Sequence, residues 1–190
     1  MDDLIKREKD LHSEGEQVLE KLQILNILSR FGSPKTVGSF ATGLMVWRDL
    51  DIVLEKEIDE KGYWETVNLL FYSPRLKYLT LTDFRNSTNP NTPKGLYLGI
   101  KYWFENKEWK IDVWFIAPRA PGSENFNEWI KEKLDEKSRR IILGIKSKIY
   151  NNPDYKKKIY SVDIYKAVIN EGIVDLGGFR KYLAKSGRSI

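Results

Sequence analysis

The stretch that decides the fold is Val37-Gly38-Ser39 followed, after nine intervening residues, by Asp49-Leu50-Asp51-Ile52. In a β-strand, successive side chains point to opposite faces, so Asp49 and Asp51 would share one face while Leu50 and Ile52 are buried on the other. Two neighbouring carboxylates repel each other unless a cation lies between them. A Gly-Ser turn lets the backbone approach an anion and adds a hydroxyl and an N–H donor. The pattern therefore predicts a paired-carboxylate metal site beside an anion-binding turn.

A third carboxylate candidate, Asp112, lies in the apolar segment Lys110-Ile111-Asp112-Val113-Trp114-Phe115. A charged side chain in such a segment must be paired or lie at a polar edge. If this strand lies beside the strand of Asp49 and Asp51, three carboxylates converge, and such a cluster binds magnesium or manganese. Asp112 would then be a metal ligand, a base for an incoming hydroxyl, or both. The alternative is a surface aspartate on an edge strand. Arg48 is a candidate for neutralising phosphate charge.

The composition excludes several other kinds of site. The 190-residue chain has no cysteine and a single histidine, His12, which rules out thiolate metal sites and leaves little material for a histidine-rich metal site or a Ser-His triad. Any metal would therefore be held by oxygen ligands. Apolar residues make up 41% of the chain, enough for a packed core. Met1–Arg7 is not a signal peptide, and no segment has the length and apolarity of a membrane span, so we expect a cytoplasmic protein.

The hydrophobic pattern predicts an α+β protein. Three- to four-residue periodicity predicts helices over about residues 3–30, 60–72, 124–136, 138–150, 161–171 and 176–186. Strands are expected over about residues 36–39, 50–54, 75–85, 96–104 and 109–116, with a hairpin turn at 105–108. The break Ala117-Pro118-Arg119-Ala120-Pro121-Gly122 divides the chain into an α+β domain at 1–118 and a helical C-terminal region at 119–190.

The order h-G-S, D-h-D-h and a later h-D-h strand (h is apolar) resembles the polymerase-β-type nucleotidyltransferase superfamily over about residues 20–116. The segments around Gly38-Ser39 and Asp49–Asp51 are most similar to the small antibiotic enzymes of the aminoglycoside or lincosamide type and to the minimal nucleotidyltransferases. The resemblance implies a mixed β-sheet flanked by helices and a Mg²⁺-dependent (or Mn²⁺-dependent) transfer of a nucleoside monophosphate from an NTP, ATP or GTP, to a hydroxyl, with release of pyrophosphate. Carried over, Gly38 and Ser39 bind the triphosphate, Asp49 and Asp51 the metals, and Asp112 is the third carboxylate.

The acceptor is expected to be a small hydroxylated molecule, with RNA 3′ ends or a protein side chain as the alternatives. Residues 131–190 hold 15 Lys/Arg and 7 Asp/Glu, a net charge of +8, which either attracts an anionic partner or forms a solvated helical surface. A non-catalytic domain that binds nucleotide, RNA or a partner protein is the competing hypothesis. The sequence does not determine the oligomeric state.

Several further side chains have two interpretations. Aromatic residues on the strands are either core or a surface that stacks a base; these are Tyr102, Trp103, Phe104, Trp109 and Trp114. Lys156-Lys157-Lys158 is either a solvated run or an RNA contact, and Arg139 and Arg140 are candidates for reaching triphosphate oxygens. Tyr165, Val168, Ile169, Phe179 and Leu183 either pack two helices together or line an acceptor pocket.

Overall fold

The computed structural model describes residues 2–56, 59–89, 92–118, 125–155 and 157–190. The chain divides into two compact units, each built from separate stretches of sequence. The sheet unit comprises residues 12–41 and 47–124, and the helical unit comprises residues 1–11, 42–46 and 125–190. The sequence predicted a single division near residue 118; in the structure, two earlier stretches also join the helical unit. The predicted boundary, between residues 118 and 119, adjoins residues 119–124, which lie outside the described residues.

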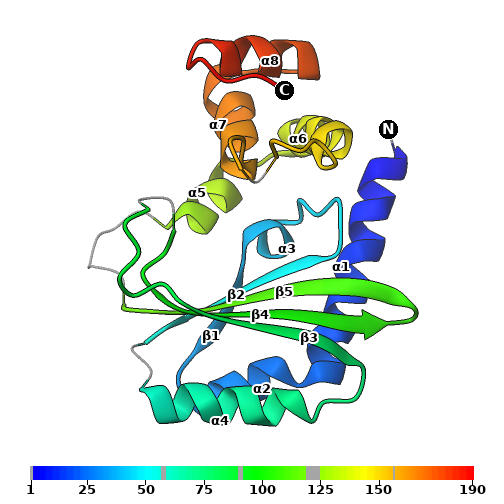
Figure 1. Ribbon diagram of the computed structural model, residues 1–190. Helices are drawn as coiled ribbons and strands as arrows, with labels where there is room; N and C mark the ends of the chain where they lie inside the picture. Colours follow the sequence, from blue (N-terminus) through cyan, green and yellow to red (C-terminus); the bar gives the residue numbers. More distant parts are fainter. Residues whose placement is uncertain (1, 57–58, 90–91, 119–124, 156) are drawn as a thin grey trace. The chain divides into compact units, whose positions relative to one another are not determined.

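The sheet unit contains a five-stranded mixed β-sheet (Figure 1). Its strands are β1 (Pro34–Val37), β2 (Asp49–Glu55), β3 (Leu76–Asp83), β4 (Gly95–Phe104) and β5 (Lys107–Ile116). The order across the sheet is β1-β2-β5-β4-β3, with β2 and β5 parallel and the other neighbours antiparallel. The predicted mixed sheet and α+β class are therefore confirmed.

One face of this sheet forms the core of the unit. Alternate residues of the central strands are almost inaccessible to solvent: Leu50, Ile52, Leu54, Leu98, Ile100, Ile111 and Val113. Helices α2 (Ile24–Ser29) and α4 (Glu60–Phe71) lie against this face in Figure 1. From α4, the Tyr63 ring meets Phe115 edge to face, and its hydroxyl donates to the Tyr97 carbonyl oxygen at 2.7 Å. Each fully buried aliphatic side chain contributes about 1.5–3 kcal/mol, so this face holds the sheet and its helices together.

The opposite face carries the polar residues of the same strands, as the period-two alternation requires. We call it the carboxylate face, because Asp49, Asp51 and Asp112 lie on it. β4 and β5 are joined by the tight turn Glu105-Asn106, in which both residues have positive φ (47° and 60°). That geometry suits a two-residue hairpin turn and matches the right-handed twist of the strands. The predicted hairpin turn is thus present, and it aligns β4 with β5 next to Asp112.

The N-terminal segment differs from its prediction. The single helix expected over residues 3–30 is two helices, α1 (Asp2–Leu22) and α2, separated by Gln23 with φ 53° and ψ 24°. A left-handed residue interrupts the helical hydrogen bonds and changes the direction of the chain. The sequence has no glycine or proline at this position from which the break could be predicted. Val37 ends β1, and Gly38 begins the short helix α3 (Gly38–Thr42), so the strand predicted to reach Ser39 stops two residues earlier.

The helical unit contains α5 (Phe126–Lys133), α6 (Glu136–Ile149), α7 (Ser161–Glu171) and α8 (Leu176–Ala184), close to the predicted ranges. Asp135 and Ser138 form a capping box at the start of α6, and Gly172 (φ 64°) ends α7 in the left-handed conformation. Ile142, Leu143, Tyr165, Val168, Phe179 and Leu183 make the core of this unit. Four of the five residues considered for an acceptor pocket are therefore packing residues, and the fifth, Ile169, is half-buried.

A fully buried lysine joins α6 to the 42–46 stretch of the same unit. Lys146 Nζ donates to the Leu44 carbonyl oxygen at 2.5 Å and to the Tyr165 hydroxyl at 3.1 Å. Arg139 Nη1 donates to the carbonyl oxygens of Thr42 and Gly43, at 3.2 and 2.6 Å. These bonds satisfy backbone acceptors at the C-terminal end of α3 and in the residues that follow it. In the described part of the chain, every helix is too short or too polar to serve as a membrane span.

Candidate active site

The register of the two parallel strands brings the three carboxylates together. β2 and β5 lie side by side in the sheet (Figure 1). Asp51 on β2 lies directly opposite Asp112 on β5, and Asp49 lies opposite Lys110. The residues between them, Leu50 and Ile111, are completely buried on the other face. Asp49 is only 4% exposed. The condition set by the sequence, that the Asp112 strand must neighbour the Asp49–Asp51 strand, is therefore met.

Lys110 lies among these carboxylates. Its Nζ is 3.6 Å from Asp49 Oδ1 and makes a very close ion pair with Asp112 Oδ2. Burial alone would lower the pKa of Lys110, but the charges of Asp49 and Asp112 outweigh it, and the pKa is raised. The ammonium group is therefore charged at neutral pH. No role was predicted for Lys110 from the sequence. Its position two residues before Asp112 in a strand indicates that both side chains lie on the same face.

Tyr97 on β4 is a second group that the sequence analysis missed. Its hydroxyl donates to Asp112 Oδ1 at 2.7 Å. Burial and then this hydrogen bond raise the pKa of Tyr97 well above its ordinary value, so it stays protonated as a donor. Gly99 lies opposite Asp112 on β4, and a Cβ at Gly99 would be 2.6 Å from the Tyr97 hydroxyl oxygen. The glycine therefore leaves the space in which this hydroxyl reaches Asp112.

Gly38 lies against Asp51. It has φ 68°, and a Cβ there would be 2.5 Å from Asp51 Oδ2. Glycine is thus required both by the backbone conformation and by the approach of the carboxylate. Ser39 follows it as the second residue of α3. The Gly-Ser turn and the carboxylate pair therefore meet in space as their spacing suggested, while the binding of a triphosphate by Gly38 and Ser39 stays a prediction.

Arg48 has a different partner from the one predicted for it. Its guanidinium forms a two-point ion pair with Glu14 of α1, with Nε–Oε2 at 2.8 Å and Nη2–Oε1 at 3.1 Å. Lys107 Nζ reaches the same carboxylate at 2.6 Å. Burial would raise the pKa of Glu14, but hydrogen bonds from Arg48 and Lys107 prevail and lower it. To contact a phosphate, Arg48 would have to leave this pair.

The donor set suits a hard divalent cation. Three aspartates on neighbouring strands offer only oxygen ligands, as Mg²⁺ and Mn²⁺ prefer. In the described ranges, no three Asp, Glu or His side chains are grouped in the present arrangement so as to hold a metal ion. In this arrangement the ammonium group of Lys110 pairs with Asp49 and Asp112. The oxygen donors of Asp49, Asp51 and Asp112 therefore suit Mg²⁺ or Mn²⁺ by chemistry, and their role as metal ligands stays a prediction.

The aromatic side chains divide between core and surface. Tyr102, Phe104 and Trp109 are buried in the core, which excludes them from stacking a base. Trp103 is 38% exposed and has Lys77 Nζ 4.7 Å from its ring. Trp114 alone of the predicted set lies near the carboxylates on their face, two residues beyond Asp112, and packs with Tyr97 at 4.8 Å between ring centroids.

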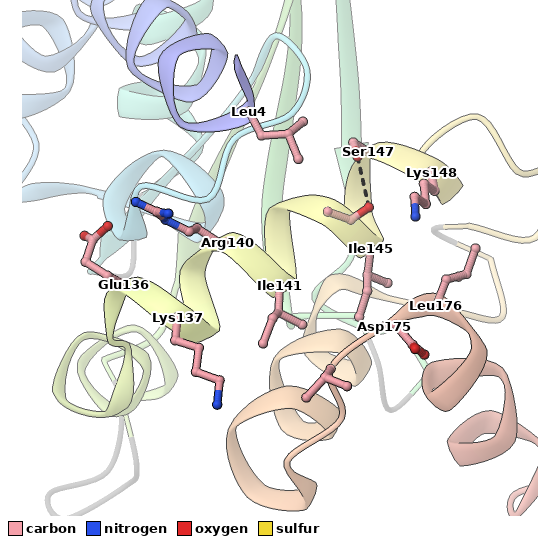
Figure 2. Close-up of a pocket in the computed structure, with 12 residues that line it drawn as sticks. Leu4, Glu136, Lys137, Arg140, Ile141, Ile145, Ser147, Lys148, Asp175 and Leu176 are labelled. Atoms are coloured by element: carbon pink, nitrogen blue, oxygen red, sulfur yellow. Dashed lines mark hydrogen bonds between the residues drawn. The ribbon is translucent and has the colours of Figure 1, made fainter. Parts of the chain in front are cut away.

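The helical unit contains a separate groove of about 720 Å³ (Figure 2). Side chains of α6 form one side, and Leu4 of α1 and residues 174–176 complete it. Arg140, one of the two arginines considered for triphosphate binding, lines this groove, whereas Arg139 bonds to the 42–46 stretch. In the Lys156-Lys157-Lys158 run, Lys156 lies outside the described residues and Lys158 is exposed and paired with Asp154 at 3.1 Å.

No protein-family model and no curated protein sequence matches the chain. Solved structures do match. One is the non-canonical poly(A) polymerase complex GLD-2–GLD-3, with 18% identity, a TM-score of 0.50, and coverage of 89% of this chain and 58% of that chain. Another is the GLD-2/RNP-8 complex, with 13% identity, a TM-score of 0.50, and coverage of 87% and 64%. The chain thus spans less than two thirds of these structures, and it has the nucleotidyltransferase fold.

Proposed function

We propose that the protein is a nucleotidyltransferase that moves a nucleoside monophosphate from an NTP to an acceptor hydroxyl. The observation that carries the proposal is the pairing of Asp51 with Asp112 across β2 and β5, with Asp49 on the same face and Gly38 against Asp51. This arrangement supports the proposal, because three carboxylates of the kind that hold Mg²⁺ share one sheet face with the Gly-Ser turn beside them. The nucleotidyltransferase fold of the solved neighbours supports the same activity.

In the proposed reaction, the acceptor oxygen forms a bond to the α-phosphorus while the bond from that phosphorus to the pyrophosphate oxygen breaks. A bound divalent cation supplies charge neutralisation for the triphosphate. Asp49, Asp51 and Asp112 would hold the cation, and Gly38 and Ser39 would contact the triphosphate through backbone and hydroxyl donors. Asp112 also takes the proton of the acceptor hydroxyl. Tyr97 orients the Asp112 carboxylate through its 2.7 Å hydrogen bond to Oδ1. The other oxygen, Oδ2, pairs with Lys110, so it becomes available for the reaction when Lys110 moves.

The acceptor that we propose is a small hydroxylated molecule, as in the antibiotic-modifying enzymes that the sequence resembles. The solved neighbours carry the name poly(A) polymerase, which makes an RNA 3′ hydroxyl the alternative within the same reaction class. An acceptor panel should therefore contain aminoglycosides, lincosamides and short oligoribonucleotides. ATP and GTP are the first nucleotides to test, with Mg²⁺ and then Mn²⁺.

The test is pyrophosphate release by the purified chain with this panel. The Asp49→Asn/Asp51→Asn double variant and the Asp112→Asn variant should lose turnover, whereas Asp154→Asn, a matched change at a surface ion pair in the helical unit, should retain it. Circular dichroism would verify that each variant is folded. Absence of both NTP binding and turnover in the wild-type protein, with either metal, would refute the proposal.

A second candidate function is a non-catalytic domain that binds nucleotide, RNA or a partner protein. The observation that favours it is Lys110, since its ammonium group already pairs with two of the three carboxylates. Equilibrium dialysis with radiolabelled ATP and GTP separates the two functions. Metal-dependent binding without pyrophosphate release by any acceptor would favour the second candidate, and release would exclude it.

A further inference from the structure

Lys110 makes the carboxylate face unusual, because a protein cation is placed among residues that suit a metal cation. Its Nζ pairs with both Asp49 and Asp112, and the charge of Asp51 acts on it as well. The two strands create this contact directly, because the register sets Lys110 opposite Asp49 and two residues before Asp112. The lysine is thus built into the site by the fold.

The positive charge of Lys110 compensates the negative charges of the three aspartates when no metal is bound. Asp49 and Asp112 are largely buried, with side chains 5% and 14% exposed. Buried carboxylates close to one another are unstable as anions unless a cation or hydrogen bonds compensate them. Three carboxylates carry a formal charge of −3, and Lys110 reduces it to −2. The ammonium group therefore stabilises the arrangement of the strands before any metal binds.

The same contact must oppose a bare metal ion. A divalent cation bound by Asp49 and Asp112 would lie close to the ammonium group, and like charges a few ångströms apart repel strongly away from bulk water. The lysine can also move, since its side chain is 44% exposed and has a flexible four-carbon stem. A metal–triphosphate complex carries its own negative charge, which gives the displaced ammonium group a new partner.

We propose that Lys110 is an internal counter-ion that occupies the position of the metal between Asp49 and Asp112. The site is then stable without a bound metal, binds bare divalent cations weakly, and takes up the metal together with the triphosphate. Lys110 then positions the Asp49 and Asp112 carboxylates when no metal is bound, and it contacts phosphate oxygens when the metal–triphosphate complex is bound. This inference rests on the proposed function for the identity of the triphosphate. The competition between Lys110 and a bare divalent cation is independent of the proposed function.

The test compares three variants with the wild-type chain. Lys110→Gln removes the charge and keeps much of the length, and Lys110→Arg keeps the charge. Lys101→Gln is the matched control, because Lys101 lies opposite Lys110 on β4 but pairs with Glu108 at 2.8 Å. Bare Mn²⁺ binding is measured by electron paramagnetic resonance titration. Binding of a non-hydrolysable Mg-NTP is measured by calorimetry, and thermal unfolding is recorded in a chelator and in Mn²⁺.

Lys110→Gln should bind bare Mn²⁺ at least tenfold more tightly than the wild type and bind the Mg-NTP at least threefold more weakly. Its unfolding temperature should be lower than that of the wild type in chelator and recover in Mn²⁺. Lys110→Arg and Lys101→Gln should stay within threefold of the wild type for bare Mn²⁺. The opposite signs for bare metal and nucleotide are the signature, since a merely structural lysine would weaken both.

Unchanged or weaker Mn²⁺ binding by Lys110→Gln would overturn the inference. The two proposals fail separately. A wild-type chain that turns over NTP, combined with no gain of Mn²⁺ affinity in Lys110→Gln, refutes the counter-ion alone. Tight Mn²⁺ binding by Lys110→Gln, combined with no NTP binding or turnover by the wild type, refutes the proposed function alone.

Discussion

Replacing Gly38 by alanine is expected to destabilise the sheet unit and to disable nucleotide binding. Gly38 has φ 68°, and an L-residue in the left-handed region costs about 1–2 kcal/mol. The new Cβ would lie 2.5 Å from Asp51 Oδ2, whereas non-bonded atoms need about 3.5 Å, so the carboxylate must move by roughly 1 Å. Asp51 is the neighbour of Asp112, and we expect that movement to separate the two carboxylates.

The control separates backbone strain from the steric contact. Gly172 has φ 64° but nothing within 4 Å of a Cβ, so Gly172→Ala suffers only the conformational cost. Each kcal/mol lowers the unfolding temperature by about 2–4 °C in a chain of this size. We expect Gly38→Ala to unfold at a lower temperature than Gly172→Ala and to lose Mg-NTP binding at least tenfold in calorimetry. Equal unfolding temperatures with unchanged nucleotide binding would show that Gly38 does not control the position of Asp51.

Three other predictions concern separate parts of the molecule. Gly99→Ala, whose Cβ would be 2.6 Å from the Tyr97 hydroxyl, and Tyr97→Phe should each lower kcat about tenfold with little change in KM. The reason is the lost hydrogen bond from Tyr97 to Asp112, since a hydrogen bond to a carboxylate contributes about 1.5–3 kcal/mol. Unaffected turnover in both variants would remove Tyr97 from the mechanism. Lys146→Met should lower the free energy of unfolding in urea by about 1–3 kcal/mol, since the Leu44 carbonyl oxygen loses its donor, whereas Lys148→Met at the exposed surface should change it little; equal effects would contradict the anchoring role. The pKa of Glu14 is lowered below its ordinary 4.5, so the stability that its ion pair contributes is present above that pH and is lost as the pH falls through the lower folded-state pKa. Glu14→Gln should therefore lose less stability on acidification than Glu20→Gln, measured by urea unfolding across that pH range. Identical pH profiles of the two variants would refute the role of the ion pair.

The site was predictable from the sequence to the extent that local alternation determines it. Asp49 and Asp51 share a face because side chains alternate in a strand, and the same rule places Lys110 with Asp112. Applied strictly, the rule also separates buried Trp109 from Trp114, which lies on the carboxylate face. The proximity of Gly38 to Asp51 follows from the pairing of Val37 with Asp51 in the antiparallel β1–β2 ladder.

The remaining features depend on contacts between distant residues, which no local pattern contains. β2 and β5 are neighbours although β3 and β4 lie between them in sequence, so the convergence of Asp51 and Asp112 was a condition rather than a derivation. Arg48 was expected to meet phosphate, but Glu14, 34 residues earlier, holds its guanidinium group. The left-handed Gln23 carries no glycine or proline signal, so the division of the N-terminal helix was not foreseen.

The proposed reaction requires that Asp49, Asp51 and Asp112 together bind the metal of a metal–triphosphate complex. The most direct measurement is a crystal structure with Mn²⁺ and a non-hydrolysable NTP, in which anomalous scattering locates the metal. We expect a Mn²⁺ peak within bonding distance of carboxylate oxygens from all three aspartates, with the triphosphate at Gly38-Ser39 and the Lys110 ammonium group moved to phosphate oxygens. Nucleotide bound elsewhere, or a metal without these three ligands while Lys110 still pairs with Asp49 and Asp112, would contradict it.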